Sequence, residues 1–400
     1  MQLTIESILS LHELEIRKDN KQYIIEDLVT HEFYEMPVVC IDAIELINNG
    51  LSLGEIEHLL VKKYPNEEVD LIDFGQQLLD LDLVEMVDGN KVSVEKAGTH
   101  EELGLKWISP KIGQIFFNRF TRFFYPLLLL VNIIFFISHT DLFPRYQDLF
   151  VFDTMMFNIL LYAGLSIVLI FIHESGHILA IRSFDLPTRL QIGNRLFFVV
   201  FETDLTQAWR LSSKDRNLLF LAGIYFDSVI LFLALIIKMT NPFTVGTMDG
   251  ILGLITFDIV IRIIYQCCIY MKTDLYYVFE NSTGNYNLME SGIEFIKGLV
   301  AKKQSELKNR VIVFYSFFFL IGILLTFSMF GFYYIPQLVY MMKNVLPGFT
   351  ESVSTLQFWD AVVFCTQFLI MFLLLFFSLT KKYGNRKNYR TIYSGGENNI

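Results

Sequence analysis

Hydrophobic positions along the chain first form a short, mixed pattern and then a series of long apolar runs. In the first part, apolar residues recur at helical spacing from Leu53 to Leu60, and Ser52 with Glu55 three residues later forms a capping box before them. The dipeptide Asp88-Gly89 between two apolar arms is typical of a hairpin turn. The pattern predicts a strand at 23–25, helices at about 37–48, 53–64 and 69–82, and a hairpin at 84–94. Together these elements predict a small α/β domain with winged-helix-like patterning.

Six apolar runs follow, each near the roughly 20 residues that a helix needs to cross a bilayer. They lie at about 120–138, 154–176, 217–237, 251–271, 311–332 and 358–379. The composition agrees with membrane spans, because 53% of the 400 residues are hydrophobic and only 18% are charged. The predicted fold class is a mainly α membrane protein, a six-helix transmembrane bundle with an N-terminal small α/β winged-helix-like domain.

The distribution of charge also separates the N-terminal domain from the apolar runs. Residues 1–100 hold 21 acidic and 7 basic residues, a net charge of −14, whereas the rest of the chain has +4, which gives the overall −10. The N-terminus lacks the basic segment and unbroken apolar run of a signal peptide, so the head is expected in the cytosol. No two of the four cysteines have the spacing of a thiolate metal site or redox pair.

Lysine and arginine gather in alternate loops: before the first run, between the second and third, between the fourth and fifth, and after the sixth. By the positive-inside rule this distribution predicts a multi-pass protein of the cell membrane with both termini in the cytosol. The second and fourth spans then both end at the cytosolic face. This topology brings His173, His177 and Asp274 to about the same depth.

Residues 173–177 form a candidate metal site. Their sequence is His-Glu-Ser-Gly-His, inside an otherwise apolar helical run. Two histidines four apart project from one face of a helix at a separation that one Zn²⁺ can bridge, and Glu174 lies beside a water that the zinc would activate. Glu174 is therefore the candidate general base, and ionisable groups at this depth of a membrane usually serve a function.

A catalytic zinc with an open position needs a third protein ligand. Asp274, at the inner end of the fourth span, is the first candidate because of its depth. Asp227 is the alternative; it lies eleven residues beyond Arg216, which places it roughly 16 Å into the membrane at 1.5 Å per residue, deeper than the histidine pair. It also suits a polar partner of the substrate or of a ligand histidine.

With these motifs, residues of about 115–300 resemble the site-2 protease group of membrane zinc metalloproteases. His173 to His177 match the HExxH motif of that family, and Gly223 to Asp227 stand at its GPxxN motif, with Ile for Pro and Asp for Asn. Asp274 stands at the first position of the family's Asp-Gly motif, with Leu in place of Gly. Asn287 matches the asparagine of the longer form of this motif that is seen in peptide zinc metalloproteases. The resemblance implies zinc held by the two histidines and Asp274, and a site near Gly223, Asp227 and Asn287 for substrate or for support of the ligands.

Residues of roughly 20–90 resemble the PqqD-like domain, a module that holds the leader of a ribosomally made peptide as an added strand. An ordinary winged-helix docking domain is the alternative. Between the second and third spans, residues 190–199 predict a hairpin around Gly193-Asn194, either an element that straightens a peptide substrate beside the site or a plain cytosolic hairpin.

The predicted function is zinc-dependent cleavage of a ribosomally synthesised peptide during maturation or export, with membrane lipid around the protein, a peptide transporter or maturase as partner, and no nucleic acid. Two alternatives stay open: an intramembrane protease of single-span regulatory proteins, and a non-proteolytic peptide-binding immunity or transport protein. The predicted parts are a cytosolic peptide-binding domain at 1–100, a linker at 101–118, the catalytic membrane core at 119–310, two additional transmembrane helices at 311–380 and a cytosolic basic tail at 381–400.

Overall fold

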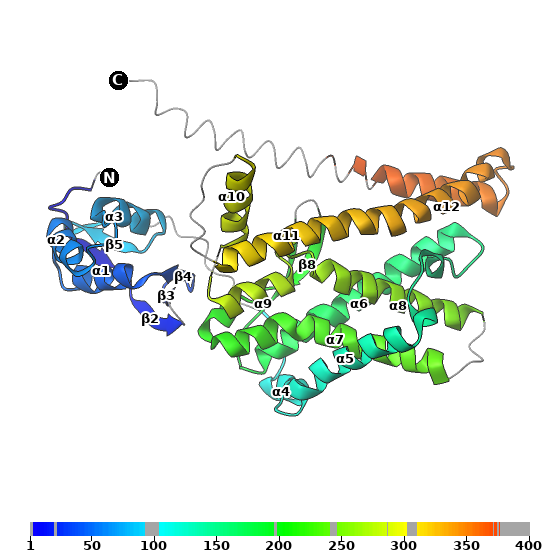
Figure 1. Ribbon diagram of the computed structural model, residues 1–400, viewed down its shortest axis with the longest axis horizontal. Helices are drawn as coiled ribbons and strands as arrows, with labels where there is room; N and C mark the ends of the chain where they lie inside the picture. Colours follow the sequence, from blue (N-terminus) through cyan, green and yellow to red (C-terminus); the bar gives the residue numbers. More distant parts are fainter. Residues whose placement is uncertain are drawn as a thin grey trace, which may run out of the picture.

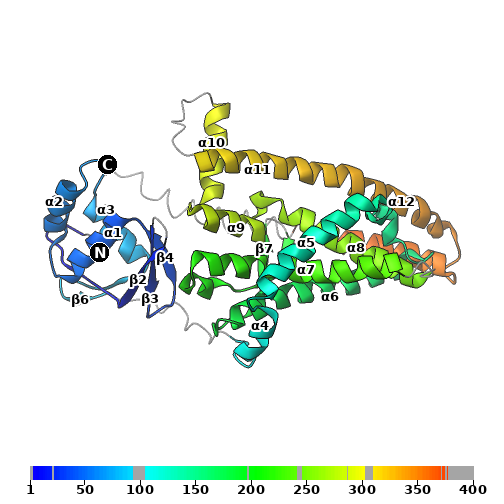
Figure 2. The ribbon, with the colours of Figure 1, turned by 60° about the horizontal axis from the view of Figure 1, so that its bottom comes forward.

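The computed structural model has an α/β head at one end of a long helical body (Figure 1, Figure 2). It describes residues 3–19, 22–92, 104–195, 198–240, 246–285, 287–301, 310–370, 372–373 and 376. The predicted basic tail at 381–400 lies outside these residues.

The head consists of two small antiparallel sheets and three helices. One sheet has the order β1-β5-β6 and the other the order β2-β3-β4. The strands are β1 (Leu9–Leu11), β2 (Leu14–Asp19), β3 (Gln22–Asp27), β4 (Phe33–Met36), β5 (Val84–Val87) and β6 (Asn90–Lys91), and the helices are α1 (Val38–Asn48), α2 (Leu53–Lys63) and α3 (Leu71–Asp80).

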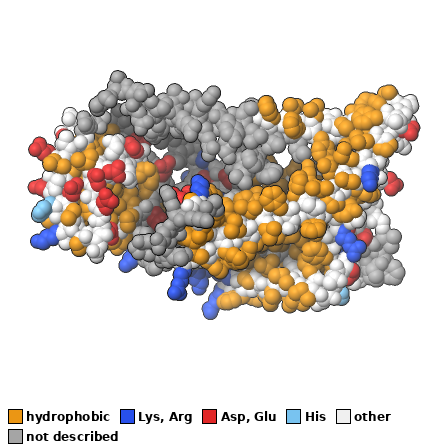
Figure 3. Space-filling view, turned by 45° about the horizontal axis from the view of Figure 1, so that its top comes forward, with side chains coloured by type: hydrophobic (Ala, Val, Ile, Leu, Met, Phe, Trp, Pro, Cys, Tyr) orange, Lys and Arg blue, Asp and Glu red, His pale blue; other side chains and the backbone are white. Residues whose placement is uncertain are grey.

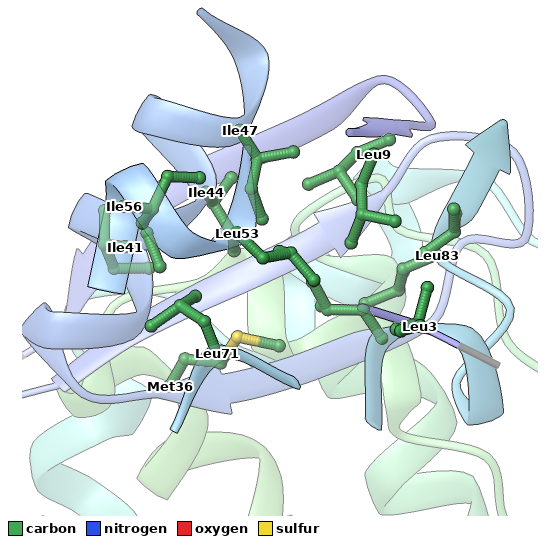
Figure 4. Close-up of a cluster of buried hydrophobic side chains, with 14 of the residues drawn as sticks. Leu3, Leu9, Met36, Ile41, Ile44, Ile47, Leu53, Ile56, Leu71 and Leu83 are labelled. Carbon is green, nitrogen blue, oxygen red and sulfur yellow. The ribbon is translucent and has the colours of Figure 1, made fainter. Parts of the chain in front are cut away.

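A single apolar core joins these helices to the strands. Its fully buried side chains include Ile44, Leu53 and Leu78, and Figure 4 shows members of the cluster directed toward one another. The predicted helices are confirmed, as is the capping box, in which the Ser52 side chain and the Glu55 side chain each accept from the other's backbone. The sequence pattern did not predict β1, β2 and β4, because short strands with alternating charged positions have little hydrophobic periodicity.

The body is almost entirely helical. Its α-helices are α4 (Pro110–Phe116), α5 (Thr121–Ser138), α6 (Met155–Arg182), α7 (Ser213–Thr240), α8 (Thr247–Gln266), α9 (Asp274–Thr283), α10 (Leu288–Val300), α11 (Arg310–Met329) and α12 (Ile335–Val345), with the hairpin β7 (Leu190–Arg195) and β8 (Phe198–Thr203) between α6 and α7. The short helical turns are η1 (Thr140–Leu142), η2 (Tyr146–Leu149), η3 (Thr206–Arg210), η4 (Ile269–Met271), the π-helical η5 (Phe330–Tyr334) and η6 (Leu346–Thr350).

Four helical segments among the described residues are long and apolar enough to cross a membrane, which indicates a membrane protein. They are α5, α6, α7 and the continuous segment Arg310–Thr350. Half of the most apolar window of α7 is buried, against 17% in each of the other three, so α7 is the central helix. Figure 3 shows hydrophobic side chains spread over the helical body, and residues such as Phe332, 76% exposed, suit a lipid-facing surface.

In the part of the chain that the structure describes, four candidate spans are found against the six predicted. The fourth predicted run forms α8, which has 20 residues but includes Asp249, Asp258 and Arg262 and is not among the four segments. The sixth run is represented by a shorter apolar helix, Leu356–Ile370, and much of its remainder lies outside the described residues. The predicted linker contains α4, where Ser109 caps the helix and Pro110 begins it.

The head contacts the body through charged side chains of β2 and β3. Arg216 of α7 is fully buried, where it pairs with Asp19 of β2, donates to Asn281 of α9 at 2.7 Å and lies over the Trp209 ring. A cavity of about 280 Å³ lies beside this contact, between β4 and the turn from α9 to α10, and Glu35 lines it. The head is therefore a packed part of the molecule in this structure.

Candidate metal centre

Two glycines let α6 and α7 cross closely enough to form the site. A Cβ on Gly176 of α6 would lie 2.5 Å from the carbonyl oxygen of Ala222, and a Cβ on Gly223 of α7 would lie 2.4 Å from Nε2 of His173. Real Cβ atoms do not come so near to such atoms, so both positions require the absence of a side chain. The structure thus places Gly223 against the histidine pair.

Three ligand atoms converge at this crossing. Nε2 of His173 lies 3.3 Å from Nε2 of His177 and 3.2 Å from Oδ2 of Asp274, and the third side of the triangle, His177 Nε2 to Asp274 Oδ2, is 3.5 Å. All three side chains are buried, with residue exposures of 4–8%. Two donor atoms each 2.0–2.1 Å from a tetrahedral metal lie about 3.3 Å apart, so these distances match one face of a tetrahedral site. The cluster can therefore hold a metal ion.

The other nitrogen of each imidazole has its own partner. Nδ1 of His177 lies 2.8 Å from the carbonyl oxygen of Leu219, and Nδ1 of His173 lies 2.8 Å from Oδ2 of Asp227. Because a carbonyl only accepts hydrogen bonds, Nδ1 of His177 is assigned as a donor. The ionised carboxylate of Asp227 also only accepts, so Nδ1 of His173 is assigned as a donor as well. In the neutral tautomers both Nε2 atoms then direct lone pairs toward each other and toward a carboxylate, an arrangement that a cation stabilises.

Asp274 is held in place from α8. Gln266 donates to Oδ2 of Asp274 at 2.7 Å and accepts from its backbone N–H at 2.9 Å, while the Thr273 hydroxyl donates to the Gln266 carbonyl at 2.7 Å. These bonds fix Oδ2 of Asp274 where it faces the two Nε2 atoms.

Asp227 lies on the far side of His173, away from the converging atoms. Its second carboxylate oxygen lies 3.4 Å from Arg262 of α8, and Arg262 also pairs with Asp258, which accepts from the Ser166 hydroxyl at 2.5 Å. Of its two predicted roles, the geometry matches that of a partner to a ligand histidine. A buried polar chain thus extends from the site toward α8.

Glu174 is buried beside the cluster and is bound by the hairpin. Thr203, the last residue of β8, donates to Oε2 of Glu174 from its backbone N–H at 2.8 Å and from its hydroxyl at 2.7 Å. These two bonds orient a carboxylate next to the cluster of His173, His177 and Asp274. A hairpin does form here, with β7 and β8 paired from Leu190 and Thr203 to Arg195 and Phe198. The predicted turn at Gly193-Asn194 is wrong, because both residues lie within β7, where they pair with Val200 and Val199.

Asn287 is not brought to the cluster. It is the residue before α10, with φ of 58°, and its backbone N–H donates to Glu280. The left-handed backbone, which asparagine tolerates better than most residues, gives this position a structural reason.

Sequence reasoning missed four residues of the site: Thr203, Arg262, Asp258 and Gln266. A signal for three of them was present, since Asp258, Arg262 and Gln266 recur every four residues within an apolar run and so form one polar stripe on α8. Thr203 had no such signal, because it reaches Glu174 only through the folding of the hairpin onto α6.

Comparison of the chain with protein-family models, with curated proteins and with solved structures finds no match. The geometry of the centre and the motifs in the sequence are thus the basis on which a function is proposed.

Proposed function

We propose that this protein is a membrane zinc metalloprotease that cleaves peptide bonds. The observation that supports this most directly is the triangle of His173 Nε2, His177 Nε2 and Asp274 Oδ2, with sides of 3.2–3.5 Å, next to the oriented carboxylate of Glu174. Two imidazoles and one carboxylate are a donor set that suits Zn²⁺ and leaves one position open. The resemblance of the motifs to those of the site-2 protease group supports the same assignment.

In this proposal each residue of the site has a separate task. His173, His177 and Asp274 hold the zinc, while Asp227 and the Leu219 carbonyl fix the ring orientations through Nδ1. The bound ion supplies Lewis-acid chemistry, polarising a carbonyl group and making water more acidic. Glu174 takes the proton from the attacking water on a carboxylate oxygen and delivers it to the leaving amine.

The substrate is proposed to be a ribosomally synthesised peptide, cut during maturation or export. The hairpin, which contacts Glu174 through Thr203, offers an extended edge to such a chain. In the head, β4 pairs with β3 along one edge, and we propose a PqqD-like, winged-helix arrangement in which the leader adds along the other edge. Both termini are placed in the cytosol, the site lies near the cytosolic face, and a peptide transporter or maturase is the proposed partner.

Metal analysis of the protein purified in detergent tests the centre. About one zinc per chain is expected for the parent and close to none for His173→Ala and Asp274→Ala. Asp227→Asn keeps all three ligand atoms and is expected to bind zinc about 10–100-fold more weakly. A parent protein that takes up no zinc under conditions that load a control metalloprotease would remove the catalytic proposal.

Hydrolysis of quenched-fluorescent peptides of mixed sequence tests the chemistry. Glu174→Gln is expected to retain zinc and to lose cleavage, because the amide cannot accept the proton. If Glu174→Gln keeps the parent's activity, or if the zinc-loaded parent cleaves none of the peptides, a peptide-binding role replaces the enzymatic one.

Peptide capture by the head is tested separately. Amide hydrogen exchange in Phe33–Met36 is measured with and without those peptides that the parent cleaves, in the Glu174→Gln protein so that they persist. Slower exchange in β4 is expected if the peptide adds as a strand. Unchanged exchange there, with cleavage intact in the parent, would assign the head to another partner and favour a substrate recognised within the membrane.

A further inference from the structure

Thr203 contacts Glu174 through both its backbone and its side chain. Its backbone N–H and its hydroxyl both donate to Oε2, at 2.8 and 2.7 Å, and the hydroxyl also lies 3.3 Å from the carbonyl oxygen of Glu174. Thr203 is 9% exposed and Glu174 is 7% exposed, so water does not compete freely for these bonds. Hydrogen bonds to an ionised acceptor in such surroundings are among the stronger ones.

We propose that Thr203 is a positioning residue for Glu174, an inference that rests on the proposed function. In the described part of the chain, both hydrogen bonds to this carboxylate end on Oε2. Oε1 is therefore the oxygen left to exchange a proton with the reacting water, while Oε2 fixes the rotation of the group. A carboxylate held in this way needs no reorganisation before it takes the proton.

The position of Thr203 itself is fixed by the hairpin on one side. Thr203 pairs with Leu190 at the open end of β7 and β8. The following residue is also held: the Thr188 hydroxyl donates to the carbonyl oxygen of Asp204 at 2.7 Å, and Arg189 donates to its carboxylate at 3.2 Å.

The head fixes the chain on the other side. From Asp204 the chain continues into η3, whose last two carbonyl groups, those of Trp209 and Arg210, accept hydrogen bonds from Arg17 of β2. Arg210 also pairs with Glu26 of β3. The segment from Thr203 to Arg210 therefore binds Glu174 at its first residue and the head at its last two residues. In this way docking of the head contributes to the position of Thr203.

Two variants of Thr203 separate the hydroxyl from the rest of the residue. Thr203→Val keeps the shape, the strand preference and the backbone donor and removes only the hydroxyl, whereas Thr203→Ser keeps the hydroxyl. For Thr203→Val we expect kcat to fall about tenfold, the effect of losing one hydrogen bond to a charged group, with KM and zinc content unchanged. Thr203→Ser is expected to restore kcat to near the parent value.

Arg17→Met tests the contribution of the head, with Arg145→Met, far along the body, as the matched control. The expected result is a lower kcat in Arg17→Met with zinc content and KM at the parent values, and no change in Arg145→Met. A parent kcat in Arg17→Met would remove the head from the proposal.

The measurements use the full-length protein in detergent, loaded with zinc, and the same quenched-fluorescent peptides. A Thr203→Val protein with the parent's kcat, or a Thr203→Ser protein as impaired as Thr203→Val, overturns the positioning role while the proposed function stands. A zinc-loaded parent that cleaves nothing, or a Glu174→Gln variant as fast as the parent, overturns the proposed function and this inference with it.

Discussion

Replacement of Gly223 by alanine would add a single methyl group against both histidines of the candidate metal centre. Glycine to alanine in a helix ordinarily stabilises the helix by about 1 kcal/mol. Here the new Cβ would lie 2.4 Å from Nε2 of His173 and 2.5 Å from Nε2 of His177, whereas ordinary contacts begin at 3.4 Å. The ligand atoms or the two helices must therefore move apart by about 1 Å.

A displacement of this size is large for a metal site. Ligand distances in such sites hold to within about 0.2 Å, and loss of a supporting contact alone weakens metal binding about 10–100-fold. Because Gly223→Ala disturbs two ligand atoms directly, we expect zinc affinity to fall by at least about 100-fold, although the variant keeps every ligand.

The assay is a competition titration against a fluorescent zinc chelator, with total zinc measured by metal analysis. Gly164→Ala on α6 is the matched control, because no atom other than those of the adjacent residues and of the nearby helix backbone lies within 4 Å of its Cβ position. This control is expected to bind zinc as the parent does and to unfold at the same or a slightly higher temperature. Parent-like zinc affinity in Gly223→Ala would refute the reasoning, since the ligand atoms could not then converge against α7 at the distances given.

Three further predictions concern the supports of the site and the head. Gln266→Leu removes the side chain that binds Asp274 on two sides, so zinc affinity in the same titration is expected to fall about 10–100-fold. Arg216→Met removes the cation that pairs with Asp19 in this buried contact, and thermal unfolding is expected to show a loss of about 3–5 kcal/mol of stability. Burial and neighbouring carboxylates raise the pKa of Glu35 from 4.5 to about 7. The protonated group therefore favours the folded state fully below about pH 4.5, and the free energy of unfolding of the parent falls by up to about 3 kcal/mol as the pH rises to about 7. Glu35→Gln is expected to remove that part of the pH dependence in unfolding temperatures measured between about pH 4.5 and pH 8.

Each of these has a result that would contradict it. Unchanged zinc affinity in Gln266→Leu would mean that α9 alone positions Asp274. An unfolding temperature of Arg216→Met equal to that of the parent would show that Asp19 regains solvent without cost, and hence that the head separates easily from the body. A Glu35→Gln protein with the same pH profile as the parent would assign the pH dependence to other groups.

Local patterns determined much of the fold in advance. The three head helices were predictable because their apolar spacing and the Ser52–Glu55 capping box depend on residues within one turn of each other. The same holds for α5, α6, α7 and the start of α11, whose apolar length exceeds what a soluble helix needs. The assignment of a full span to residues 251–271 rested on apolar length and overlooked two charges, Asp258 and Arg262. These two side chains pair with each other, and Arg262 also pairs with Asp227.

The sequence by itself determined the pairing of His173 with His177, because a spacing of four residues on a helix places both rings on one face whatever the surroundings. Only the tertiary structure decided which aspartate joins them: Asp274 meets the Nε2 atoms, and Asp227 meets Nδ1 of His173 from the other side. It also decided that Thr203 binds Glu174. These contacts join residues 29–101 positions apart, and their formation depends on the close crossing of α6 and α7 and on the packing of the hairpin and α9, which no local spacing in the chain encodes.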